Sequence, residues 1–351
     1  MRPAPGQFEG RSMHFRKLVA PAVAALAVAV AGGSVTGVSA QELRIGYSTD
    51  VPTLDPGNHR NRAAEGVILN MHDALVARTD DMLVVNELIE EWTQIDAVTY
   101  EARLRRGVLF HSGDEMTAED VKFTFDRLTK EGLMDGQTSP RKSLLGPLED
   151  TEIVDEYTVR FHLSSPWPIL RAYLPFQQVV SKRFVEEVGT DGMATQVNGT
   201  GPFRLVEWRR GDSIIMERFD DYYGGAPDLP PVGPAAVERV IFRIIPESAS
   251  RVAALLAGEV DIIDNLPVSD IPIVEANPNT RVMTTNGTRS FFANLNVRVP
   301  PFDDARVRLA ANMAVDRDLI VDRVLGGLAV PLHGLISPQS YGYNPDLEPY
   351  P

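Results

Sequence analysis

The sequence predicts an α/β fold divided into at least two lobes. A strand, a turn and a helix follow one another in residues 99–128. A β-branched strand, a short helix and a second strand occupy residues 240–263, which implies a parallel pair of strands joined by a right-handed crossover. The length of 351 residues is more than one compact hydrophobic core usually holds. These three observations together favour several α/β units.

The segment 99–128 has a separate signal for each of its elements. Apolar side chains occupy every second position of 99–104, the pattern of a strand with one buried face. A polar turn cluster, His-Ser-Gly-Asp, follows at 111–114. Thr117 is followed three residues later by an acid, which predicts a helix cap. One apolar helix face is then formed by Val121, Phe125 and Leu128.

Residue order in this segment points to a family. The run T-Y-x-x-x-L-R-x-G-V-x-F-H-x-G-D-x-x-T-A-E-D-V-x-F-T-x-D-R resembles the family 5 solute-binding proteins of ABC importers, the peptide, opine and nickel group. Further stretches are similar to the same family: L-D-P at 54–56, G-T-G-P-F at 199–203, R-x-x-x-L-x-x-G-x-V-D at 251–261 and P-F-D-D-x-R-V-R at 301–308.

The resemblance implies a two-lobed periplasmic binding protein of type II, an α/β fold with an extra domain inserted into the first lobe. Domain I is expected over 41–68 plus 196–287, domain II, the insert, over 69–195, and the start of domain III over 288–351. Family members are longer, so this chain corresponds to about two-thirds of a family protein, and the second lobe is expected to be incomplete.

An export signal is expected over residues 1–40. Arg16 and Lys17 precede an Ala/Val-rich run over 18–31, which is too short to span a bilayer comfortably. Small residues at 38–40 suit cleavage before Gln41, and either Met1 or Met13 can be the start. The sequence has no cysteine, which excludes a lipoprotein anchor and disulfides. We therefore expect a periplasmic protein.

The remaining elements follow from local periodicity and turn residues. A low-pattern linker is expected over 131–147. Asp316 is expected to cap the second of two helices near the end of the chain, with Gly326 as its stop. The glycines of the 199–203 stretch are expected to form a tight turn before a strand. Strands are expected at 43–48, 158–163, 203–208 and, as a pair, within 282–296, and helices at 63–77, 168–176, 307–315 and 318–325.

Two regions carry the candidate ligand contacts. By resemblance, the loop after Leu54-Asp55-Pro56 enters the ligand cleft, and the chain crosses between lobes near 282–296. The candidates in the loop are its polar residues Asn58, His59, Arg60 and Asn61, and in the G-T-G-P-F stretch the candidate is Thr200. The candidates at the crossing are aromatic and amide side chains: Phe291, Phe292, Asn294 and Asn296.

No catalytic or metal-binding constellation is found in the sequence. None of the six histidines forms an H-E-x-x-H or other close metal pair, and no G-x-S-x-G motif occurs. We therefore expect a protein that is not an enzyme and that needs no cofactor or metal. The net charge of −14 argues against nucleic acid and anionic membranes as partners.

The predicted function is capture of a short peptide or peptide-like solute by lobe closure and delivery to the permease subunits of an ABC importer. A monomer is expected. An opine, glutathione, a sugar conjugate or a nickel chelate are alternative ligands, because the family's main peptide-pairing residues lie beyond Pro351. A ligand sensor for chemotaxis or signalling is an alternative role on the same fold.

Overall fold

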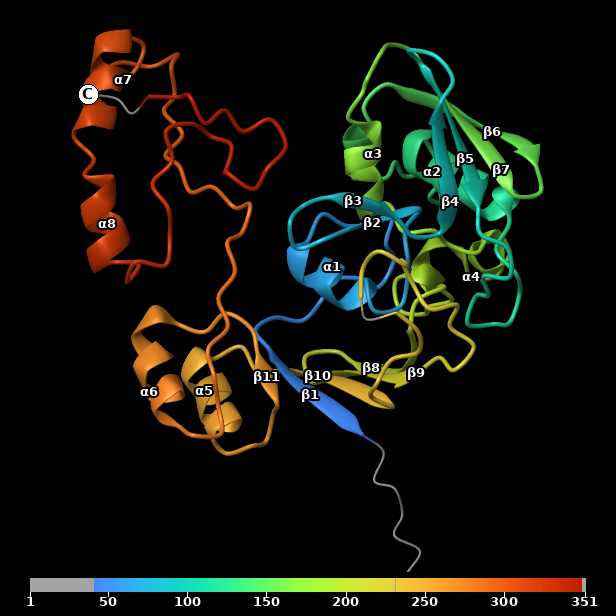
Figure 1. Cartoon of the computed structure of the whole chain (residues 1–351), viewed down its shortest axis with the longest axis horizontal. Helices are drawn as coiled ribbons and strands as arrows, with labels where there is room; N and C mark the ends of the chain where they lie inside the picture. The colour runs from blue at the N-terminus through green and yellow to red at the C-terminus, as the bar shows by residue number, and fades with distance from the viewer. Residues whose placement is uncertain (1–40, 231, 349–351) are drawn as a thin grey trace, which may run out of the picture. The chain divides into compact units, whose positions relative to one another are not determined.

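The computed structural model describes residues 41–230 and 232–348 (Figure 1). The predicted export signal over 1–40 lies outside these ranges. Within them, no helix has both the length and the apolar character needed to cross a bilayer.

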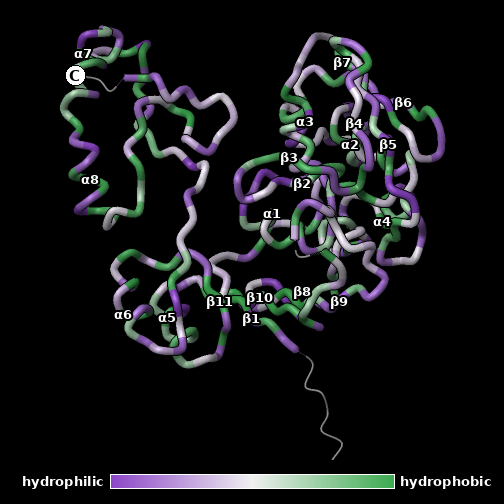
Figure 2. The backbone as a smooth tube through the Cα atoms, in the orientation of Figure 1, coloured by the Kyte–Doolittle hydropathy of each residue, from purple (hydrophilic) through white to green (hydrophobic). Residues whose placement is uncertain are grey.

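The first sheet combines the N-terminal strand with four strands that come much later in the chain. Its five strands run in the order β11-β1-β10-β9-β8. β1 pairs in parallel with both β10 and β11. The members are β1 (Glu42–Tyr47), β8 (Phe203–Arg209), β9 (Ser213–Arg218), β10 (Arg239–Ile244) and β11 (Ile262–Ile263). Figure 2 shows the hydrophobic residues of β10 in green.

The predicted crossover is confirmed in part. Helix α5 (Ser248–Leu256) joins two strands that run in parallel, but β1 lies between them, so β10 and β11 are not neighbours. Local sequence predicted the strand–helix–strand unit, whereas the strand between β10 and β11 is β1, from the start of the described residues. Pairing of this kind is nonlocal and leaves no local pattern.

In the sequence, all strands of the second sheet lie between β1 and β8 of the first sheet. Its four strands run antiparallel in the order β4-β5-β7-β6. The members are β4 (Ile89–Gln94), β5 (Thr99–Leu104), β6 (Leu148–Asp155) and β7 (Thr158–Leu163). Helix α2 (Ala118–Thr129) packs on β6 and β7. A separate two-stranded sheet is formed by β2 (Val76–Arg78) and β3 (Val84–Asn86).

Helix α2 confirms the predicted cap. Thr117 accepts a hydrogen bond from the backbone N–H of Glu119, and the Asp120 carboxylate accepts one from the backbone N–H of Thr117. This reciprocal arrangement satisfies N–H groups that the first turn leaves without helical partners.

The other described helices are shorter or lie later in the chain. They are α1 (Arg62–Ile68), α3 (Leu170–Tyr173), α4 (Lys182–Met193), α6 (Ile271–Ala276), α7 (Ala305–Met313) and α8 (Arg317–Arg323), with 3-10 turns η1 (Lys142–Leu145), η2 (Leu174–Phe176) and η3 (Val268–Asp270). The Asp316 carboxylate accepts from the N–H of Leu319, which confirms its predicted role as the cap of α8.

Each large sheet has its own hydrophobic core. One core draws its buried residues from 75–179, including Phe110, Phe125 and Phe161. The other draws them from 51–71 and 203–242. The chain passes from one core to the other between Met71 and Leu75, both fully buried.

Two predicted elements are wrong. The helix expected over 63–77 ends at Ile68, because the apolar residues beyond it are buried in the passage between two cores rather than on one helix face. The strands expected within 282–296 are absent, and the backbone there is irregular. The described residues give this segment no partner strand, and an isolated strand leaves its N–H and C=O groups unpaired.

The G-T-G-P-F stretch at 199–203 packs against residues 70–72, where the chain first passes from one core to the other. Gly201 N donates to Met71 O at 3.0 Å and Phe203 N donates to Asn70 O at 3.0 Å. A Cβ on Gly199 would lie 2.0 Å from Met71 O, and one on Gly201 would lie 2.5 Å from the Met71 carbonyl carbon. The glycines are therefore needed for close backbone approach, not for the tight turn that the sequence predicted.

Candidate functional site

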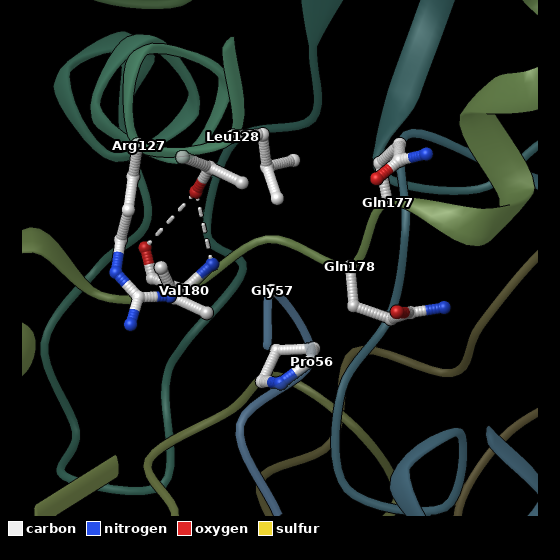
Figure 3. A pocket seen from close by; sticks show the side chains of 8 residues that line it. Pro56, Gly57, Arg127, Leu128, Gln177, Gln178 and Val180 are labelled. Carbon is white, nitrogen blue, oxygen red and sulfur yellow. Dashed lines mark hydrogen bonds between the residues drawn. The ribbon is translucent and has the colours of Figure 1, made fainter. Parts of the chain in front are cut away.

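The loop that follows β1 is anchored by a buried ion pair. Nη1 and Nη2 of Arg127 donate to the two carboxylate oxygens of Asp55 at 2.9 and 2.6 Å. Both side chains are almost completely buried. Figure 3 shows Arg127 extending from α2 beside Val180, on one side of a pocket that Pro56 and Gly57 also line. The pocket is too narrow to admit a water molecule. This pocket is thus part of the packing that holds the loop.

The next part of the loop is held by segment 139–143, which the sequence predicted only as a linker. Ser139 Oγ donates to Gly57 O at 2.6 Å. Arg141 Nε donates to His59 O at 3.1 Å, and its Nη2 lies 2.8 Å from His59 Nε2. Arg141 also forms an ion pair with Glu65 of α1. The loop is therefore bound to the segment at two successive points.

His59 is a buried, neutral component of this network. Burial, with the nearby positive charge of Arg141, lowers the pKa of its imidazole to about 4. Its Nδ1 lies 3.2 Å from the backbone of Asn61. The ring therefore has protein partners on both nitrogens, and its contact with a ligand stays a prediction.

The other three candidates in the loop differ in their surroundings. Asn58 is half-buried, with its backbone N–H donating to Asp55 O. The Asn61 carboxamide accepts from Ala64 N at 3.0 Å, so it caps α1. Arg60 is exposed and donates to Ser143 Oγ at 3.0 Å. Of these three residues, Arg60 is the one whose side chain is both exposed to solvent and rich in hydrogen-bond donors.

Thr200 lies in a buried polar cluster. Its hydroxyl is fully buried and donates to the Asp73 carboxylate at 3.2 Å. Burial raises the pKa of Asp73 to about 7. Burial, with the nearby Asp73 carboxylate, also raises the pKa of Glu87 well above its ordinary value. The phenols of Tyr222 and Tyr223 complete the cluster, with their pKa values raised by burial and by these carboxyl groups.

A cation lies at the edge of this cluster rather than within it. Arg105 Nε donates to Glu87 O at 2.6 Å, and its guanidinium lies 5.9 Å from the ring of Tyr223. The two carboxyl groups therefore share an interior site without a direct ion-pair partner among the described residues. Such a site favours the protonated acids.

The four candidates near 282–296 are all exposed. Phe291 and Phe292 are 81% and 61% exposed, and the Arg289 guanidinium lies 4.9 Å from the Phe291 ring. Asn296 accepts from the N–H of Arg298, while Asn294 is exposed. Their contact with a ligand also stays a prediction.

A second hollow lies between the turn after Phe110, helix α4 and the start of β8. It is an open groove of about 280 Å³, lined by His111, Ser112, Arg183, Phe184, Glu187, Val197, Asn198, Arg204 and Leu205. Both arginines already form ion pairs, with Asp114 and with Glu217. Across the described ranges, no group of three or more His, Asp or Glu side chains is arranged to hold a metal ion.

Sequence reasoning missed the residues that hold the loop. Arg127 belongs to the family-like run, but its partner Asp55 is 72 residues away. Arg141 lies in a segment without periodicity, and its partner His59 is 82 residues away. A polar residue that is buried through a distant partner has no local sequence signal.

Comparison with known proteins agrees with this architecture. Residues 84–351 match the family described as "Bacterial extracellular solute-binding proteins, family 5 Middle". The glutathione-binding protein GsiB of Salmonella choleraesuis is 28% identical over 333 residues, which cover 94% of this chain and 62% of GsiB. The chain thus spans somewhat less than two thirds of the length of this curated relative.

Solved structures of periplasmic binding proteins are also similar to this chain. The ABC transporter-associated periplasmic binding protein DppA from Helicobacter pylori, in complex with peptide STSA, has a TM-score of 0.78 and 27% identity, covering 88% of this chain and 63% of DppA. AgaA from A. tumefaciens R10, in complex with agropinic acid, has a TM-score of 0.69 and 28% identity, covering 87% of this chain and 60% of AgaA.

The fold is thus that of a type II periplasmic binding protein, as the sequence predicted. The matched relatives are solute-binding proteins rather than enzymes. The family match extends over most of the chain. The chain belongs to the bacterial extracellular solute-binding proteins of family 5.

Proposed function

We propose that the protein is the solute-binding component of an ABC importer and takes a short peptide or peptide-like solute to a membrane permease. The family match over residues 84–351 carries this proposal. The similarity to a DppA bound to a tetrapeptide supports the ligand class. Periplasmic location, a monomeric state and the absence of catalysis and of nucleic-acid binding belong to the same proposal.

The proposed domain division is supported by the two sheets and their cores. Domain I, 41–68 plus 196–287, contains the five-stranded sheet. Domain II, 69–195, contains the four-stranded sheet and its core. Domain III begins at 288. In the whole protein, a ligand that contacts both lobes stabilises the closed state over the open state, and the permease recognises closure.

A binding panel tests the proposal. The full chain is titrated with peptide Ser-Thr-Ser-Ala, reduced glutathione and agropinic acid, and its melting temperature and heats of binding are measured. At least one of these three ligands should raise the melting temperature of the chain by about 5 °C when the ligand concentration is about 100 times its Kd. Mass spectrometry of the ligand after incubation should show it unchanged. A chemically altered ligand, or no binding of any of the three, would contradict the proposal.

A further inference from the structure

Arg60 carries a positive charge that no acidic side chain of the described residues neutralises. Its Nη1 donates to two neutral oxygens, Ser143 Oγ at 3.0 Å and Pro140 O at 3.5 Å. The only cations of the stretch 57–62 are Arg60 and Arg62, and the stretch contains no acid. On a chain of net charge −14, this loop is a locally basic surface.

The two acidic side chains that flank residues 57–62 in the sequence, Asp55 and Glu65, are already paired. The Glu65 carboxylate forms an ion pair with Arg141 and accepts from Gln178 Nε2 at 2.9 Å. Asp55 is likewise satisfied by Arg127. An incoming anion therefore meets an exposed guanidinium at Arg60 without competition from either carboxylate. A guanidinium binds a carboxylate through two parallel hydrogen bonds.

Alternate residues of 139–143 hold successive parts of the loop. Ser139 binds the carbonyl of Gly57, Arg141 binds the carbonyl and ring of His59, and Ser143 binds the guanidinium of Arg60. Arg141 is itself buried, with a side chain 3% exposed. A buried arginine with several partners loses little further freedom when a ligand binds, so the loop is preorganised.

We propose that Arg60 receives a carboxylate group of the bound solute and that Arg141 is the positioning residue that holds the loop for this contact. This inference rests on the proposed function, since it assigns a subsite within the same binding role. It narrows the ligand class to solutes with a free carboxylate near this loop.

The carboxylate contact is tested with a matched pair of charge-removing variants. Arg60→Gln and Arg62→Gln each remove one exposed positive charge from neighbouring positions. The probes are reduced glutathione and Ser-Thr-Ser-Ala, each compared with its form in which the carboxylates are esterified or amidated. We expect Arg60→Gln to weaken binding of the free acid about tenfold or more and to leave the blocked form unchanged. Arg62→Gln should change neither by more than about twofold.

The positioning role is tested by hydrogen exchange on the full chain without ligand. Arg141→Lys keeps the charge but loses the planar fork of donors. We expect the amides of residues 57–61 to exchange about tenfold faster, while those of β5 keep their rate. The control is Arg171→Lys, because Arg171 bonds Asn86 in another part of the insert. This control should leave residues 57–61 unchanged.

The outcomes separate the two claims. Equal weakening by Arg60→Gln and Arg62→Gln would mean general electrostatic attraction and would overturn the carboxylate subsite. The subsite would also fall if Arg60→Gln left free-acid binding intact. Equal acceleration in β5 and in residues 57–61 would reduce Arg141 to a general stabilising residue. If the wild-type chain bound none of the probes, the proposed function and the subsite would both fail, while the exchange rates would still decide the role of Arg141.

Discussion

Asp73 shows how burial changes the behaviour of one carboxyl group. Its pKa is raised to about 7, chiefly by burial, whereas an aspartate in an unfolded chain titrates near 4. The folded protein therefore keeps a proton that the unfolded chain releases. Stability from this group is fully present below about pH 4 and is lost as the pH rises through 7. Glu87 acts in the same direction, because its pKa is also raised.

Replacement of Asp73 by Asn should reduce this pH dependence. Asn resembles the protonated acid in shape and cannot ionise, so the variant avoids burying a negative charge at high pH. We expect the melting temperature of Asp73→Asn, relative to wild type, to rise by about 3 °C or more between pH 5 and pH 8. Asp81→Asn, at an exposed position, is the control. If the difference in melting temperature between Asp73→Asn and wild type stayed constant with pH, Asp73 would not be the source of the pH dependence.

The Asp55–Arg127 pair allows a second test at single residues. Replacing Arg127 by Met leaves the buried Asp55 carboxylate without its cation, which should cost about 3–5 kcal/mol of unfolding free energy. The matched control is Arg103→Met, because Arg103 is half-exposed and pairs with Glu90 and Glu91, so its loss should cost about 1 kcal/mol or less. Urea unfolding measures both. If the two variants lost similar amounts of unfolding free energy, the buried Asp55–Arg127 pair would stabilise the fold no more than an exposed ion pair does.

At the level of elements, local patterns predicted structure where the determining contacts are local. The capping box of α2 and the cap of α8 depend on residues within one turn, and both were predicted correctly. Strand β7 matches its predicted range because side-chain alternation is also local. The position of β1 between β10 and β11 depends on distant partners, so the predicted crossover was only partly correct. The backbone of 282–296 is irregular, and the strands predicted there were wrong.

The same distinction applies to the candidate site. The loop at 55–61 was predicted as a ligand contact from a resemblance, and that role stays a prediction; in the structure His59 lies against the Asn61 backbone and Asn61 caps α1. The residues that hold it, Arg127 and Arg141, could not be predicted from the sequence alone because their partners are far away in the chain. Likewise, the glycines of 199–203 predicted a turn, whereas their role is close approach to Met71.

Close approach at these glycines leads to a prediction for the paired segments 70–73 and 199–203. Gly201→Ala places a Cβ 2.5 Å from the Met71 carbonyl carbon, so one of the two backbones must move. We expect a loss of about 1–3 kcal/mol or more in unfolding free energy. Gly287→Ala is the control, because its Cβ would have only one neighbour, at 3.9 Å. Unchanged stability of Gly201→Ala in urea unfolding would show that the segments separate without cost.

At the level of the whole molecule, buried hydrophobic side chains are distributed unevenly along the chain. Within the described ranges, all of them lie between Val51 and Val274. After this point, large apolar residues such as Met283, Phe291 and Val324 are mostly exposed, and the segment 282–296 has no strand partner. Because burial of apolar surface is the main stabilising contribution to folding, cooperative stability should reside in residues 41–281.

Limited proteolysis of the full chain tests this distribution. Chymotrypsin at a low ratio should cut first within 282–300, where exposed Phe291 and Phe292 offer cleavage sites in irregular backbone. The large product should melt within about 3 °C of the intact chain, because cleavage there removes little buried apolar surface. Intact-mass analysis locates the cut, and calorimetry compares the two transitions. A markedly lower melting temperature of the product would mean that residues after 281 contribute to the cooperative core, since the loss of exposed side chains alone has little effect on unfolding.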